Sequence, residues 1–199
     1  MMLAHAAVLA LVMTSPHPAL CSDPSRTAMT TAQDHPHDSD VTEVEPGAFY
    51  RSGTRIGMAA GASFVIPPQW QGYLPPGSRT FYLESPTRPG IGLIAVIQDA
   101  TPEDMEEHLN EPQVIEEGYV LHPVGAATRT ETRVTASYHS GDNVGRAVAC
   151  FGPVDNGILF LFTGPKDETA YYESLLEQME ASTKFAAARQ HPFERRDGT

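Results

Sequence analysis

The chain has 199 residues, 41% of them hydrophobic and 19% charged, and its 25 Asp and Glu against 13 Lys and Arg give a net charge of -12. This composition supports about one globular domain with a real core, and it excludes a fully disordered chain and a membrane bundle. Two cysteines exclude a disulfide-stapled miniprotein, and the acidic balance disfavours nucleic acids and acidic lipid surfaces as partners.

An apolar run over residues 3–13 opens the chain and is broken only by His5. The run is too short to span a bilayer, which takes about 20 residues, but it has the length of the apolar region of a secretory signal peptide. We therefore predict a signal peptide over residues 1–21 and an extracytoplasmic protein, located in the periplasm, at the cell envelope or in the medium. Ala19-Leu20-Cys21 is equally compatible with a soluble secreted chain and with a lipoprotein lipidated at Cys21. The alternative to a signal peptide is a misassigned start codon, which would make this segment an extension without function.

Residues 22–60 are rich in Ser, Thr, Asp, Pro and His without sustained periodicity, which predicts a flexible linker. Within it, His35-Pro36-His37 lies between Asp34 and Asp38, and imidazoles beside carboxylates suit Zn, Cu or Ni. Because a flexible linker fixes no ligand geometry, we expect no tight metal site there and no cofactor.

Apolar runs become regular from residue 61, and we place the folded domain at residues 61–186, followed by a disordered polar tail at 187–199. Strands are predicted where apolar or alternating runs end at Pro, Gly or Asn: 63–66, 80–83, 91–97, 133–139, 147–151 and 158–162. Turns at Ser140-Gly141-Asp142-Asn143 and Asp155-Asn156-Gly157 would join the last three strands as hairpins, so the sheet should be mostly antiparallel.

Two helices are predicted to cover this sheet. Thr101-Pro102-Glu103-Asp104 combines an N-cap residue, a first-turn proline and acidic residues, and this helix should end near Asn110. The second should run from about Lys166 to Lys184, with a buried stripe of Tyr172, Leu175, Leu176 and Met179. The expected fold class is α+β, an α/β/α sandwich around a central, mostly antiparallel sheet.

Several of these segments, in this order, resemble the PsbP-like group of exported proteins and bacterial lipoproteins. They are the strand and turn Phe64-Val65-Ile66-Pro67-Pro68-Gln69-Trp70, the Thr101-Pro102-Glu103 helix start, the strand at 157–162 with Gly164-Pro165, and the closing Ser182-Thr183-Lys184-Phe185. The resemblance covers about residues 61–186. It implies a sandwich of this kind and an accessory or binding module without an enzymatic site, and no functional residue of the group can be matched here.

Seven carboxylates lie within residues 103–117 without a Lys or Arg, and Glu103, Asp104, Glu106 and Glu107 form their densest part. Clustered carboxylates can hold a hard divalent cation or dock a basic partner. The run lacks the spacing of a calcium loop, so a solvated helix face is the default interpretation.

Signals for nucleophilic catalysis are weak. The sequence contains no Gly-x-Ser-x-Gly, no His-Glu-x-x-His and no phosphate-binding loop followed by Lys. His139-Ser140-Gly141-Asp142 holds suggestive residue types, but neighbours in a turn do not build a triad. Cys150 lies in an apolar strand, where a thiol is typically a buried small hydrophobe.

Trp70, Tyr73 and Leu74 follow the first predicted strand in a Pro- and Gly-rich loop. Such residues can rim a ligand cleft or an interface, although Trp70 could instead fold back onto the core. The leading hypothesis is a non-enzymatic binding or accessory module that takes a protein partner or small ligand at the cell envelope. The alternatives are a hydrolase whose site forms only in the fold, and a divalent-cation-binding domain that uses the acidic run.

Overall fold

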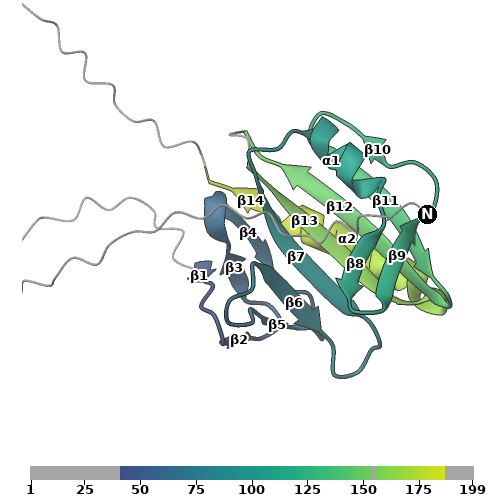
Figure 1. The fold of residues 1–199 in the computed structure, drawn as a ribbon. Coiled ribbons are helices and arrows are strands. Elements are labelled where there is room, and N and C mark those ends of the chain that lie inside the picture. The colour runs from purple at the N-terminus through teal and green to yellow at the C-terminus, as the bar shows by residue number, and fades with distance from the viewer. Residues whose placement is uncertain (1–40, 154–155, 187–199) are drawn as a thin grey trace, which may run out of the picture. The chain divides into compact units, whose positions relative to one another are not determined.

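The computed structural model describes residues 41–153 and 156–186. These residues form one large and one small β-sheet and two α-helices (Figure 1). In the ten-stranded sheet the order is β2-β5-β6-β7-β13-β12-β11-β9-β8, with β10 also paired to β11. The four-stranded sheet has the order β1-β3-β4-β14.

The strands of the large sheet are β2 (Phe49–Tyr50), β5 (Gln71–Tyr73), β6 (Thr80–Glu84), β7 (Ile91–Gln98), β8 (Gln113–Glu116), β9 (Tyr119–Pro123), β10 (Thr128–Arg129), β11 (Arg133–Ser140), β12 (Asn143–Phe151) and β13 (Asn156–Pro165). All pairings described within this sheet are antiparallel, as the hairpin signals predict. The small sheet contains β1 (Val41–Glu43), β3 (Arg55–Gly57), β4 (Ala62–Val65) and β14 (Lys184–Phe185), and β1 runs parallel to β3.

Helix α1 (Pro102–Leu109) begins as the sequence predicts, with Thr101 as the N-cap. The hydroxyl of Thr101 accepts a hydrogen bond from the backbone N–H of Asp104, whose carboxylate in turn accepts one from the N–H of Thr101. Such a reciprocal capping box satisfies two backbone donors at a helix start. The second predicted helix divides into a 3-10 turn, η2 (Lys166–Glu168), and helix α2 (Thr169–Ser182). Another 3-10 turn, η1 (Ala59–Gly61), precedes β4.

The two helices lie against opposite faces of the central strands (Figure 1). Successive residues of a strand point to opposite faces. Val148 and Cys150 accordingly belong to the hydrophobic cluster that includes α2, whereas Ala147 and Ala149 belong to the cluster that includes α1. The buried residues of α2 are the four predicted ones, Tyr172, Leu175, Leu176 and Met179. Strands β12 and β13 thus contribute buried side chains to both clusters.

The predicted boundary at residue 61 is wrong, because the folded region already includes residues 41–60. Strands β1, β2 and β3 lie in the segment predicted as linker. Ile56 is fully buried, and Tyr50 and Met58 join it in the core cluster. These apolar residues are separated by polar and glycine residues and therefore show no periodicity along the chain, yet tertiary pairing buries them.

One predicted turn is displaced. Ser140 pairs with Asn143 around Gly141, which has a φ of 58°, so this hairpin turn is confirmed. Asn156 and Gly157, predicted as part of the next turn, instead lie in β13, where Gly157 pairs with Phe151. The linker's His35 and His37, the signal segment with Cys21, and the tail 187–199 lie outside the described residues.

Candidate functional site

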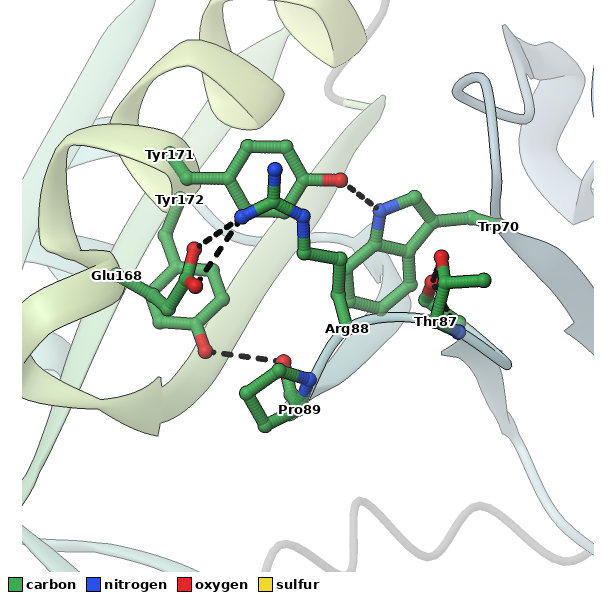
Figure 2. A network of polar contacts seen from close by, with 8 residues as sticks. Trp70, Thr87, Arg88, Pro89, Glu168, Tyr171 and Tyr172 are labelled. Carbon is green, nitrogen blue, oxygen red and sulfur yellow. Dashed lines mark hydrogen bonds and ion pairs between the residues drawn. The ribbon is translucent and has the colours of Figure 1, made fainter.

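Trp70 lies in the core. Its side chain is 1% exposed and meets the ring of Phe162 edge-on, with ring centroids 5.2 Å apart. The indole Nε1–H donates a hydrogen bond of 2.9 Å to the Tyr171 hydroxyl (Figure 2). Trp70 therefore folds back onto the core, and it does not present its ring to a ligand at the surface.

A polar network joins the loop before β7 to the start of α2 (Figure 2). The Arg88 guanidinium lies over the Tyr171 ring, 4.6 Å from its centroid, and donates to both carboxylate oxygens of Glu168 at 3.1 and 2.9 Å. Arg88 and Glu168 thus compensate each other's charge. Arg88 also contacts Tyr171, whose hydroxyl accepts the hydrogen bond from Trp70.

The Tyr172 hydroxyl extends this connection from the buried face of α2. It donates a hydrogen bond of 3.1 Å to the carbonyl of Pro89 (Figure 2). Burial, followed by the negative charges of Glu168 and Asp167, raises the pKa of Tyr172 to about 12. The hydroxyl therefore stays protonated and acts as a donor that ties the loop to the helix.

The exposed aromatic surface of the domain lies elsewhere, at the edge of the large sheet. Phe49 on β2 is 72% exposed, the largest exposed fraction among the large hydrophobic side chains of the described residues. It pairs with Tyr73 on β5 and stacks on its ring, with centroids 4.6 Å apart and planes 15° apart. Because β2 is an end strand of the sheet, one side of this pair has no strand beside it within the described residues.

The chain neighbours of this aromatic pair, Leu74 and Tyr50, anchor it to the core. Leu74 packs against the core cluster, and its carbonyl accepts a hydrogen bond from the N–H of Gly47. Tyr50, beside Phe49, is buried, and its hydroxyl accepts a hydrogen bond of 2.6 Å from the N–H of Glu45. Trp70, Tyr73 and Leu74 were predicted to rim a ligand cleft or an interface. Of these three, only Tyr73 stacks on an exposed aromatic ring.

Phe49 was missed because it falls in the segment predicted as linker. The available signal was the adjacent aromatic pair Phe49-Tyr50 within an otherwise polar stretch. Two neighbouring aromatic residues on a strand point to opposite faces, so one can enter the core while the other faces solvent. That alternation is what the structure contains.

Two of the four predicted metal ligands, Asp104 and Glu106, already accept hydrogen bonds from other residues. The Asp104 carboxylate accepts hydrogen bonds from the hydroxyl and the N–H of Thr101, which lower its pKa. Glu106 accepts a hydrogen bond of 2.7 Å from Arg129, while Glu103 and Glu107 are exposed. In the part of the chain that the structure describes, no group of three or more His, Cys, Asp or Glu could hold a metal ion. A cation site on these four residues stays a hypothesis.

The two candidate nucleophiles, Cys150 and Ser140, lie on strands β12 and β11. Cys150 is buried, and burial, followed by the charge of Glu180, raises its pKa to about 12. The carboxylate of Asp142 bonds to Lys166 at 3.0 Å. Among residues 41–153 and 156–186, no hydrogen bond connects His139, Ser140 and Asp142 in a relay. His139 instead lies opposite His122 across the β9–β11 pairing.

These elements define a small domain with a curled antiparallel sheet, two helices and an exposed aromatic pair at one sheet edge. No family model and no curated protein matches the chain. Among solved structures it is similar to the cyanobacterial PsbP of Synechocystis, with 13% identity, a TM-score of 0.45, and coverage of 72% of this chain and 95% of that one.

The Ran-binding protein Mog1p of Saccharomyces cerevisiae is similar at 10% identity, with a TM-score of 0.43, covering 66% of this chain and 94% of Mog1p. A protein of Bacteroides thetaiotaomicron has 14% identity, a TM-score of 0.41, and coverage of 72% of this chain and 50% of its own. A PsbP is thus among the structures that this chain resembles. At these identities and TM-scores the likenesses transfer no activity, partner or location.

Proposed function

We propose that this protein is a non-enzymatic binding module that docks a partner protein through the aromatic pair Phe49–Tyr73. The observation that supports it is Phe49, which is 72% exposed and held flat against Tyr73. Aromatic side chains on a rigid support are typical anchors of protein interfaces, since they bury a large area and lose little rotamer freedom. Single exposed hydrophobic side chains are common on protein surfaces, so the proposal depends on the stacked pair and not on the exposure of Phe49 alone.

The charges of the domain indicate the chemistry of that partner. Residues 61–183 carry 17 Asp and Glu against 6 Lys and Arg, and Glu43 and Glu45 precede the aromatic pair. Opposite charge on the two partners steers encounter and excludes wrong partners. The partner we expect therefore offers an apolar pocket for Phe49 surrounded by basic side chains.

The α/β/α sandwich predicted from the sequence belongs to this proposal as the rigid support of the aromatic pair. Helices α1 and α2 pack against opposite faces of the central strands, so these parts of the sheet are not open to a partner. No helix of the described residues is long and apolar enough to cross a membrane. We place the protein outside the cytoplasm, with a mature N-terminus at Cys21 or Ser22 and Cys21 as the lipidation site if it is anchored.

The test is isolation of the tagged full chain from its own cells after mild crosslinking. Phe49→Ala is compared with the wild type and with Val124→Ala, a control at a 51% exposed hydrophobic residue directly after β9. Losing a hot-spot anchor typically costs about 2 kcal/mol or more of binding free energy. The amount of the specific partner recovered with Phe49→Ala should therefore be at least about tenfold lower than with the wild type. Val124→Ala should retain it fully.

An equal yield of the same partner with Phe49→Ala would refute this docking surface. The melting temperature of each variant is measured alongside, and we expect little change because Phe49 contributes little buried area. Intact mass of the isolated chain reports where the mature chain begins and whether Cys21 carries lipid. A chain found only at full length in the cytosol would refute the proposed location.

A further inference from the structure

We propose that His122 and His139 form a surface site for one divalent transition-metal ion of the kind that prefers imidazole, such as Zn²⁺ or Cu²⁺. The two residues are directly opposite each other on adjacent antiparallel strands, β9 and β11. Directly opposed side chains of an antiparallel pair point to the same face of the sheet, with Cβ atoms about 5 Å apart. The site is independent of the aromatic pair at the other end of the sheet.

The spacing of the two rings suits a single shared ion. Their centroids are 6.0 Å apart and their planes 41° apart. With metal–nitrogen distances of about 2.1 Å, an ion bound by two imidazoles lies about 3.2 Å from each ring centroid. The centroids of such a pair are about 5.2 Å apart at a tetrahedral angle and about 6.4 Å apart when the rings face each other across the ion. The observed separation lies between these values.

Both imidazoles have nitrogen atoms free for coordination. Both side chains are exposed, and the hydrogen bonds of the described residues include none to either ring. This differs from the acidic run, where Thr101 and Arg129 already engage two carboxylates. Imidazole nitrogens favour Zn²⁺, Cu²⁺ and Ni²⁺, whereas carboxylates favour Mg²⁺ and Ca²⁺. We therefore expect the histidine pair and the acidic run to prefer different metal ions.

The surrounding charges favour a bound cation. Arg146 on β12 is opposite Ser137, two residues before His139, and its Nε is paired with Glu173 at 3.0 Å. Its charge is therefore compensated next to the site. The strong net negative charge of the domain further raises the local concentration of cations.

The strands give this site a rigid base. On β12, Val144 pairs with His139 and packs against the core cluster that includes α2. Ligands fixed on adjacent strands need little ordering when an ion binds, unlike histidines on a flexible segment. Because the structure offers two protein ligands, water or a group from another molecule completes the coordination.

The test is calorimetric titration of the full chain with ZnCl₂. The background carries His35→Gln and His37→Gln, which removes the other histidine pair close in sequence. We expect one Zn²⁺ equivalent bound, and an affinity about 100-fold lower in either His122→Gln or His139→Gln, because each loses the gain of a second ligand on the same scaffold. His108→Gln, the control at a histidine on α1, should bind like the background.

A second readout separates metal binding from misfolding. Zn²⁺ should raise the melting temperature of the background protein but not of the two variants, since the paired site exists only in the folded state. MgCl₂ should give no shift that depends on His122 or His139. Unchanged Zn²⁺ affinity in either variant, or an equal loss in His108→Gln, would overturn the proposal, as would a Zn²⁺-induced rise that persists in both variants.

Discussion

At the scale of single residues, burial determines the reactivity of Cys150. The thiol lies on β12 within the core cluster, where burial and the charge of Glu180 raise its pKa to about 12. The thiolate is the reactive form of cysteine, and a raised pKa keeps it rare at neutral pH. The prediction from the apolar strand, that this cysteine is a buried hydrophobe, therefore agrees with its surroundings.

We expect Cys150 to resist alkylation in the native state. In the Cys21→Ser variant, which leaves Cys150 as the remaining cysteine, iodoacetamide at pH 8 should modify the protein only after denaturant is added. The measurement is the intact mass over time with and without denaturant. Modification of the native protein at the rate of the denatured chain would contradict the assigned burial.

At the scale of elements, the contact between the loop before β7 and the helix α2 depends on two glycines. A Cβ added at Gly164 would collide with the Tyr172 hydroxyl and approach the Cα of Gly90 to 2.9 Å. At Gly90, which has a φ of 104°, an added Cβ would lie 2.6 Å from the same hydroxyl. The two backbones therefore approach closely around Tyr172, and its hydrogen bond to Pro89 closes the contact.

Gly164→Ala should destabilise the fold by about 1–3 kcal/mol, the usual cost of overpacking. Tyr172→Phe removes the nearest colliding atom, so the double variant should be less destabilised than the sum of the two single variants. Gly145→Ala is the control, because its added Cβ would meet Leu121 and Tyr138 instead of Tyr172, so its effect should add to that of Tyr172→Phe. The measurement is chemical denaturation of the single and double variants, and strict additivity of Gly164→Ala with Tyr172→Phe would contradict the proposed collision.

Elements with a strong local signal were predictable from the sequence. The buried stripe of α2 and the Thr101 N-cap of α1 depend on residues within one or two turns, and both are confirmed. The two-residue strands β2, β10 and β14 lack any such signal. Their pairing is set by segments far along the chain, such as Phe185 opposite Ala62, so local periodicity cannot indicate them.

The candidate site was predictable only in part for the same reason. Tyr73 stands out in the sequence as an aromatic loop residue, but its partner Phe49 lies more than twenty residues earlier, in a stretch whose polar composition predicts a linker. The sequence places His139 beside Ser140 and Asp142, whereas the fold brings it opposite His122. Both pairs are created by strand register, which depends on the whole sheet.

For the molecule as a whole, the residues that pack in the core define where the folded region begins, and the polar composition of residues 41–60 does not. Ile56 is 0% exposed, and β3 pairs with β4 through Ile56 and Phe64. Removing a buried Ile or Leu side chain alone costs about 2–5 kcal/mol, and whole domains are stable by only about 5–15 kcal/mol. A chain that lacks β3 and Tyr50 would therefore lose stability comparable to the total.

This argument predicts different behaviour for two truncated chains. The chain 41–186 should unfold cooperatively, with a melting temperature within a few degrees of that of the full chain, because it keeps every described core residue. The chain 61–186, which follows the boundary suggested by composition, should show no cooperative transition, since it exposes the core surface that Ile56, Met58 and Tyr50 cover. Circular dichroism melts of both chains test this difference. A cooperative melt of 61–186 near that of 41–186 would mean that β1, β2 and β3 contribute little to the stability of the domain.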